Sequence, residues 1–260
     1  MEDELAVEEA DALDLEEGKA DVGGTYTYYL IERDFRLCIS PFCGGVFYRR
    51  ANANTTKCID GTKQDRCYAA SMDLGPTNLD STGLAKMNAG EGTLLVRATI
   101  KKDVWAEFGT FARVRVTEAW PGQLPVGHDG VVVKVEDTGL RCITYPCPSL
   151  REHKLNSSLK ATLAEVGFEG SGASDEQVAA ALEQMHTNGL IIAGDRYQVS
   201  GPAGTGKARS VTQFWLRATN DVCAIIDCAA PPHGCHYEGA QFTPCDQQTC
   251  GQLVCENPPF

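Results

Sequence analysis

Several features that would announce a function are missing from this chain of 260 residues. No run approaches the ~18–20 consecutive apolar residues of a membrane-spanning helix, so we expect no membrane span. Phosphate binding needs a basic face, and no cluster of Lys and Arg in the sequence supplies one, so we expect no nucleic-acid partner. The signatures GxSxG, HExxH and the EF-hand loop do not occur either. The sequence therefore indicates no catalytic residue and no cofactor, and we lean towards a protein that is not an enzyme.

The spacing Cys-x2-Cys, which is usual in zinc ribbons and thioredoxin-like redox sites, is also absent, although the chain has 12 cysteines. The spacing that recurs is Cys-x4-Cys, which favours disulfides and hence an oxidising compartment. The protein is then exported to the periplasm, the outer-membrane surface or the medium, after removal of a signal peptide or a lipoprotein leader that could leave a lipid anchor. We expect disulfides at Cys38, Cys43, Cys58, Cys67, Cys142, Cys147, Cys223, Cys228, Cys235, Cys245, Cys250 and Cys255.

No metal site is expected. The cluster His233-Gly234-Cys235-His236 combines imidazole and thiol groups, which suit zinc. If the neighbouring cysteines form disulfides, however, no thiolate is free, and two histidines alone make a weak site.

One pattern occurs twice. The segment Cys38–Cys43 is followed 104 residues later by Cys142–Cys147, and each first cysteine precedes an asparagine, Asn52 or Asn156, by fourteen residues. A β-rich run precedes both segments at the same offset. We interpret this as a duplicated, disulfide-closed α+β unit with the order β-β-β-α-β-β in each copy.

The repeat sets the expected domain boundaries. Residues 25–125 form the first copy and residues 126–220 the second. Residues 1–24 are predicted to be a flexible acidic segment, because ten acids and one base leave too little apolar surface to offset the entropy of ordering. Residues 221–260 form a disulfide-rich tail, whose six cysteines allow fifteen connectivities.

Two helices are expected, one in each copy. In the second copy Ser174 precedes the early acids Asp175 and Glu176, and Asn188-Gly189 follows the last periodic residues, which predicts a capped helix between them. The helix of the first copy is expected around residues 78–87.

The repeat also predicts disulfide pairs. The second copy has counterparts of Cys38 and Cys43 but none of Cys58 and Cys67, and cysteines that are absent together were bonded together. We therefore predict the bonds Cys38–Cys43, Cys142–Cys147 and Cys58–Cys67. The first two close short loops and should stiffen a turn.

A phosphate-loop pattern, GxxxxGK, occurs at residues 201–207. Ala208 stands where the Mg²⁺-binding Ser or Thr should be, and the residues that follow have the pattern of a strand rather than a helix. Glycines between two strands favour a hairpin turn, so we do not expect nucleotide binding here.

The cysteine-bearing motifs RLCISPFCGGVFYRRAN, CIDGTKQDRCYAASMDL and DTGLRCITYPCPSLREHKLN, with the tail DCAAPPHGCHYEG, resemble an uncharacterised family. Its members are secreted or lipoprotein-like proteins of social and predatory Gram-negative bacteria. The resemblance spans most of residues 16–255. It implies an envelope or extracellular location and assigns neither an activity nor a catalytic residue.

The leading functional expectation is a non-enzymatic surface or extracellular module that binds a protein or glycan, or that assembles with itself. The candidate binding residues are those inside the two short cysteine loops: Ser40, Pro41, Phe42, Thr144, Tyr145 and Pro146. A secreted protease inhibitor is the first alternative, because Cys58-Ile59-Asp60-Gly61 resembles the Cys-x-Asp-Gly turn of Kazal-type inhibitors. A filament subunit and a hydrolase with a site between the copies are further alternatives.

Overall fold

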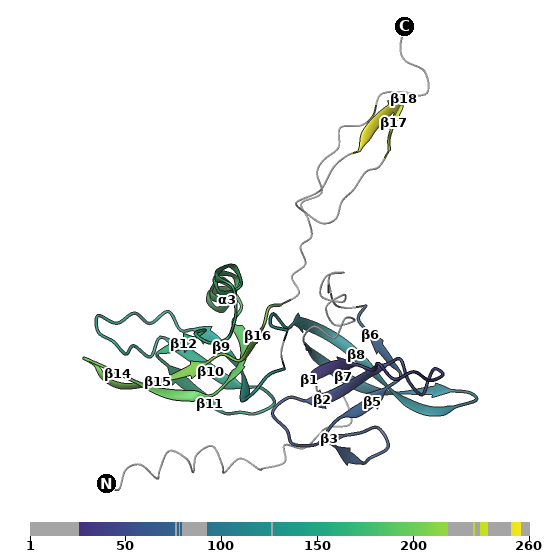
Figure 1. The fold of residues 1–260 in the computed structure, drawn as a ribbon, viewed down its shortest axis with the longest axis horizontal. Coiled ribbons are helices and arrows are strands. Elements are labelled where there is room, and N and C mark those ends of the chain that lie inside the picture. The colour runs from purple at the N-terminus through teal and green to yellow at the C-terminus, as the bar shows by residue number, and fades with distance from the viewer. Residues whose placement is uncertain are drawn as a thin grey trace. The chain divides into compact units, whose positions relative to one another are not determined.

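The computed structural model describes residues 26–75, 77, 79, 93–125, 127–217, 231, 235–238 and 251–255 (Figure 1). The chain divides into two compact units, Met1–Ala218 and Thr219–Phe260. The larger unit includes the first predicted domain, residues 25–125, and all but the last two residues of the second, residues 126–220. In the part of the chain that is described, no helix has the length and apolar character needed to cross a membrane.

The first half of the larger unit is one sheet with the strand order β5-β2-β1-β7-β8-β6. β5 pairs antiparallel with β2 at one edge, and β6 pairs parallel with β8 at the other. Only Ala70 separates β5 from β6, and its N–H donates to the carbonyl of Ala112 at 3.0 Å, so the sheet closes into a small barrel. The strands of this sheet are β1 (Thr27–Arg33), β2 (Val46–Arg50), β5 (Cys67–Ala69), β6 (Ser71–Asp73), β7 (Leu94–Trp105) and β8 (Gly109–Pro121). The short strands β3 (Thr56–Lys57) and β4 (Lys63–Gln64) form a separate two-stranded sheet between β2 and β5 in the sequence.

The second half closes in the same way. Ala164 separates β11 from β12 and donates to the carbonyl of Lys207 at 2.7 Å, and β12 pairs parallel with β15. The last two strands are each interrupted once, so that β13 continues as β14 and β15 as β16. The elements are β9 (Val131–Asp137), β10 (Leu150–Lys154), β11 (Lys160–Leu163), β12 (Glu165–Gly167), α3 (Asp175–Thr187), β13 (Leu190–Gly194), β14 (Arg196–Gly201), β15 (Gly204–Ser210) and β16 (Gln213–Trp215).

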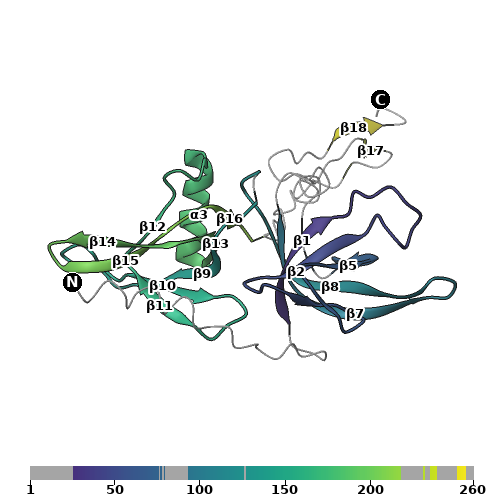
Figure 2. The same cartoon turned by 60° about the horizontal axis from the view of Figure 1, so that its bottom comes forward.

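Both halves therefore have one strand order. We number the strands of each barrel from 1 to 5 and count an interrupted strand as one. These strands are β1, β2, β5–β6, β7 and β8 in the first barrel, and β9, β10, β11–β12, β13–β14 and β15–β16 in the second. In both barrels strand 1 pairs with strands 2 and 4, and strand 3 pairs with strand 2 and, in parallel, with strand 5. This is the five-stranded Greek-key barrel of the OB fold. In both views the β7–β8 hairpin extends at one end of the unit and the β14–β15 hairpin at the other (Figures 1 and 2).

The fold is mostly β, which refines the predicted α+β class. The one helix in the described residues, α3, lies between strands 3 and 4 of the second barrel, as the sequence predicts. Ser174 caps it with a complete capping box, and Asn188 is its C-cap. The helix expected around residues 78–87 lies outside the described residues.

Three apolar clusters form the core. The first fills the first barrel and includes Tyr48 and Val114, and the second fills the second barrel beneath Ala181 and Met185 of α3. The third joins the barrels and is made of Leu30, Ala51, Leu95, Trp120, Val132, Leu155, Ile191, Ala193 and Trp215. Each barrel thus buries one face internally and part of its outer face against the other barrel.

Two asparagines exchange equivalent hydrogen bonds across this joint. Asn52 accepts from the N–H of Val132 and donates to the carbonyls of Val132 and Leu155. Asn156 accepts from the N–H of Tyr28 and donates to the carbonyls of Tyr28 and Ala51. Both adopt left-handed backbone conformations, with φ of 60° and 59°. Asparagine tolerates this region better than most residues, so the backbone and the side chain favour the same residue type here.

The smaller unit contains a two-stranded antiparallel sheet of β17 (Cys235–Glu238) and β18 (Gln252–Cys255). Cys235 and Cys255 lie opposite one another in this sheet and form a disulfide. This bond determines one of the pairings that the sequence left open.

Candidate binding loops

The two cysteine loops occupy the same position in the two barrels. The loop Cys38–Cys43 connects β1 to β2, and the loop Cys142–Cys147 connects β9 to β10. In OB barrels, ligands contact the loop between strands 1 and 2 and the loop between strands 4 and 5. The candidate residues chosen from the sequence therefore lie where this fold places ligand contacts. This is an analogy at the level of the fold and assigns no ligand.

Four disulfides lie within the described residues. Cys38–Cys43, Cys58–Cys67 and Cys142–Cys147 are the three pairs that the repeat predicts, and Cys235–Cys255 is the fourth. The remaining cysteines, Cys223, Cys228, Cys245 and Cys250, lie outside the described residues. Disulfides in this number persist in oxidising compartments, so they indicate a protein that is not cytoplasmic.

The bond at Cys235 removes the thiolate from the cluster at residues 233–236, of which His233 lies outside the described residues. In the described ranges, moreover, no group of three or more His, Cys, Asp or Glu side chains could hold a metal ion.

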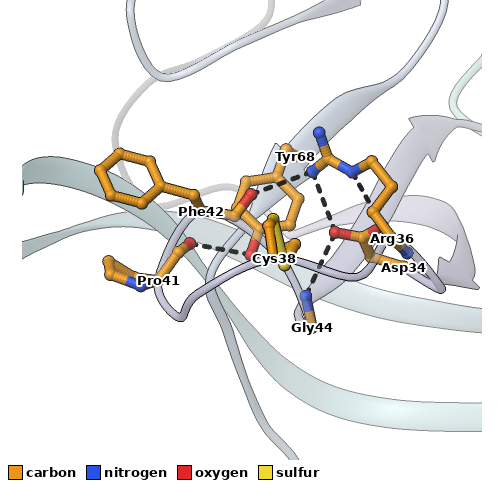
Figure 3. The surroundings of a disulfide bond; sticks show 8 residues. Asp34, Arg36, Cys38, Pro41, Phe42, Gly44 and Tyr68 are labelled. Carbon is orange, nitrogen blue, oxygen red and sulfur yellow. Dashed lines mark hydrogen bonds and ion pairs between the residues drawn. A yellow bond between two sulfur atoms is a disulfide. The ribbon is translucent and has the colours of Figure 1, made fainter.

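A buried carboxylate holds the first loop in place (Figure 3). The side chain of Asp34 is inaccessible to solvent and accepts hydrogen bonds from Nε and Nη2 of Arg36, both at 2.9 Å. It also accepts from the backbone N–H groups of Arg36 and Gly44. The hydrogen bonds from the Arg36 side chain are the main cause that holds the pKa of Asp34 below its ordinary value.

Arg36 links this carboxylate to the loop. Its guanidinium lies 5.1 Å from the ring centre of Phe47 and 5.0 Å from that of Tyr68, and it donates to the carbonyl of Phe42 at 3.1 Å. The hydroxyl of Tyr68 donates to the carbonyl of Pro41 at 2.9 Å (Figure 3). Two successive loop carbonyls therefore accept hydrogen bonds from side chains of this protein. The disulfide is thus one of several constraints on the loop.

The outer surface of the first loop is apolar. Leu37 is fully exposed, and Ile39 and Phe42 are largely exposed. The ring of Phe42 packs edge-on against Phe108 and Phe111, with ring centres 5.7 Å apart in both pairs. Phe108 is exposed and lies in the turn between β7 and β8. We call Leu37, Ile39, Phe42 and Phe108 the apolar tip. It joins the loop between strands 1 and 2 to the loop between strands 4 and 5.

The second loop packs against its own hairpin in the same way, but its surface is different. The carbonyl of Tyr145 accepts from the N–H of Ala203 at 2.9 Å, in the turn between β14 and β15. Pro146 lies over Gly206, where an added Cβ would come within 2.9 Å of the proline ring. The exposed ring of Tyr145 points its hydroxyl at Glu165, so this surface combines the exposed Ile143 with an aromatic ring and a carboxylate, whereas the apolar tip contains no charged group.

A second carboxylate, partly buried, supports this loop. Asp137 accepts hydrogen bonds from the guanidinium of Arg141 at 2.7 and 2.9 Å and from the N–H of Gly139 at 2.8 Å. Nδ1 of His186, in the last turn of α3, lies 2.6 Å from the same carboxylate. The Arg141 side chain is the largest cause that lowers the pKa of Asp137. Each loop is therefore preceded by an aspartate whose carboxylate binds a nearby arginine side chain.

The six candidate residues divide by exposure. Pro41 and Pro146 are buried and position their loops, whereas Ser40, Phe42, Thr144 and Tyr145 are exposed. No residue pattern pointed to the partners Asp34, Arg36, Phe108 and Phe111. Because they come from the segment that follows β1 and from the β7–β8 hairpin, only strand pairing brings the two groups together.

The glycine-rich motif at residues 201–207 forms a hairpin. Gly201 pairs with Gly204, which leaves Pro202-Ala203 as the turn between β14 and β15. The described residues after the motif, as far as residue 217, contain the strands β15 and β16, whereas phosphate binding would require a helix directly after the motif.

Pairing of β7 with β8 also brings together basic residues that are not adjacent in the sequence. Lys101 lies opposite Arg113, and Arg115 is two residues further along β8. All three are exposed, and none forms an ion pair with another described residue. The expectation that no basic face exists was thus too strong, although three charges make only a small one. The absence of a nucleic-acid partner remains a prediction.

These features define a class: a disulfide-linked protein of two OB-type barrels with a small cysteine-bearing unit at its C-terminus. The family model described as "Domain of unknown function (DUF6748)" matches residues 27–221, which include both barrels. The chain therefore belongs to this family. Comparison with curated proteins and with solved structures gives no match.

Proposed function

We propose that this protein is an exported, non-enzymatic module that binds another protein through the apolar tip of its first barrel. The observation that carries the proposal is the exposure of Leu37 and Ile39 on a loop that a disulfide, Asp34 and Arg36 hold in one conformation. Large apolar side chains on a fixed loop lose little conformational entropy on binding, which is a property of efficient protein contacts. The apolar side chains of the tip offer a glycan no hydrogen bonds, so a protein partner is favoured.

The proposal extends to location and origin. The described disulfides support export, and the resemblance given above supports a secreted or lipoprotein-like protein of the envelope of social and predatory Gram-negative bacteria.

We further propose that the barrels are copies of one duplicated unit. The shared strand order, the closure at Ala70 and Ala164 and the exchange between Asn52 and Asn156 support this origin. Their loops then diverged in surface chemistry.

The loop geometry offers less support for protease inhibition. A loop that enters a protease cleft must present free backbone groups in an extended conformation. Here the carbonyls of Pro41 and Phe42 already accept hydrogen bonds, and the turn at Asp60-Gly61 is closed by bonds between Cys58 and its neighbours Gly61 and Thr62.

Site-specific photocrosslinking tests the proposal. A benzophenone amino acid replaces Ile39 in the exported full-length protein in producing cells, and the matched control replaces Ile143, which is fully exposed in the second loop. We expect a protein adduct at position 39 that is absent at position 143 and that disappears when Leu37→Asp is added. Equal labelling at both positions would contradict the proposal. So would binding of the purified protein to phosphatidylethanolamine–phosphatidylglycerol vesicles without any protein adduct, because the tip would then be a membrane contact.

A further inference from the structure

The second barrel carries a carboxylate between two tyrosines. The hydroxyl of Tyr145 donates to one oxygen of Glu165 at 2.9 Å, and the hydroxyl of Tyr197 donates to the other oxygen at 2.9 Å. The carboxylate of Glu169 lies beside them: a Cβ added to Gly167 would come within 2.9 Å of the Tyr197 hydroxyl and 3.3 Å of the Glu169 carboxylate. We call Tyr145, Glu165, Glu169 and Tyr197 the Tyr–Glu cluster. Tyr145 comes from the second cysteine loop and Tyr197 from β14.

This cluster has negative charge and open aromatic surface, and the described part of the chain places no paired cation in it. Tyr145 is 41% exposed and Tyr197 is 38% exposed. Among the described residues, neither Glu165 nor Glu169 has an ion-pair partner within 4.0 Å, whereas Arg36, Arg97 and Arg141 all pair with carboxylates. Burial, followed by the hydrogen bond to Glu165, raises the pKa of Tyr197 to about 12, so its hydroxyl remains a donor near neutral pH.

The first barrel shows what such a set of groups binds. There the guanidinium of Arg36 lies against the rings of Phe47 and Tyr68 while it pairs with the carboxylate of Asp34. One carboxylate and two aromatic rings thus surround one arginine within the same protein. In the second barrel the carboxylate and the two rings are present, and the described residues supply no arginine to them.

We propose that the Tyr–Glu cluster is a binding site for an arginine side chain of a partner protein. The guanidinium is planar and weakly hydrated, so it can lie against a tyrosine ring while its N–H groups face a carboxylate. Calcium is a poorer fit, because it requires six to eight oxygen ligands and two carboxylates supply only part of them. This site lies in the other barrel from the apolar tip and gives the module a second contact of opposite character.

Short peptides test this inference with the full-length protein. The probe is acetyl-Gly-Arg-Gly-amide, and its control is the same peptide with citrulline, which keeps the shape of arginine and removes its charge. Binding is measured by ¹H–¹⁵N NMR titration. We expect the arginine peptide to shift signals of the second barrel with at least tenfold higher affinity than the citrulline peptide, and the shifts to decrease as salt is added.

The variants Glu165→Gln and Tyr197→Leu locate the site. Each should weaken the arginine peptide at least fivefold, whereas Glu107→Gln, which removes an exposed carboxylate from the β7–β8 turn, should leave its affinity unchanged. Dispersed NMR spectra show whether each variant is folded. If Glu165→Gln is unstable, Tyr197→Leu still tests the site. Equal affinity for the arginine and citrulline peptides, or unchanged affinity in both variants, would overturn the inference. The variant Ile39→Asp should bind the peptide normally, so failure of this site is distinguishable from failure of the apolar tip.

Discussion

At the residue scale, asparagine is required at two positions for two reasons at once. Asn52 and Asn156 both adopt a left-handed conformation, and each side chain makes three hydrogen bonds to backbone groups of the opposite barrel. Other residue types meet at most one of these demands: glycine accepts the conformation, and glutamine carries the amide on a longer side chain. The sequence displayed both asparagines at the same offset from a cysteine, but only the structure shows what they contact.

Replacement of Asn156 by Ala should therefore destabilise the protein strongly. The variant loses three hydrogen bonds and places alanine at positive φ, for a total of about 3 kcal/mol. Urea unfolding followed by circular dichroism measures the change. Asn54→Ala, at an exposed asparagine, is the control and should change the free energy of unfolding by less than about 0.5 kcal/mol. A similar small effect for Asn156→Ala would show that the exchange does not hold the barrels.

Asp34 predicts a pH dependence with a definite sign. Hydrogen bonds from Arg36 lower its pKa in the folded state, so its contribution to stability is complete above the unfolded-state value of about 3.9. That contribution decreases as pH falls from this value through the lower folded-state pKa.

The variant Asp34→Asn should therefore be less stable than the wild type at pH 7, and the gap between them should narrow below about pH 4. Unfolding curves recorded from pH 7 to pH 2 test this, with the exposed Asp65→Asn as control. A gap that stays constant down to pH 2 would show that the charge of Asp34 is not what stabilises the loop.

At the element scale, the two barrels fill equivalent interior positions differently. Glu152 follows Tyr48 by the same 104 residues that separate the cysteine loops, and both side chains are fully buried. Tyr48 belongs to the same apolar cluster as Ile100 and Val114, whereas the second barrel has the exposed Arg196 and the buried Arg209, both bonded to Glu152. A buried carboxylate with two arginines costs desolvation energy, so it is weak support for stability by itself.

This difference yields a prediction from two variants. Glu152→Gln should cost about 3 kcal/mol, because it leaves the buried Arg209 without its counter-charge. The triple variant Glu152→Tyr, Arg196→Ile and Arg209→Val copies the first barrel and should lie within about 1 kcal/mol of the wild type or exceed it. Thermal and urea unfolding give both values. If the triple variant is less stable than Glu152→Gln, the two interiors are not interchangeable.

Local patterns predicted the strands, the helix α3 and three disulfides, because alternation, capping residues and cysteine spacing act over a few residues. Closure of the barrels was not predictable in this way. It depends on strands of two or three residues, such as Cys67–Ala69 and Ser71–Asp73, which are too short for a periodic signal. The basic cluster around Lys101 and the contact of Phe42 with Phe108 depend on strand register, which no linear motif records.

At the scale of the whole molecule, one architecture carries both of the binding surfaces that we propose. The first barrel presents Leu37, Ile39 and Phe42 at its cysteine loop, and the second presents Ile143 together with tyrosine and glutamate at the corresponding place. The third apolar cluster and the two asparagines hold the barrels together, so both surfaces belong to one body. A module of this kind can contact a partner at two points and gain affinity without a larger single interface.

The most direct test of the proposed function is the affinity of the partner identified at position 39 for three purified proteins: the wild type, Ile39→Asp and Ile143→Asp. Isothermal titration calorimetry should show at least tenfold weaker binding for Ile39→Asp, because a charge replaces an exposed apolar side chain of the tip. Ile143→Asp should bind like the wild type. Equal affinity of all three proteins, or equal loss in both variants, would contradict the assignment of the binding surface to the first barrel.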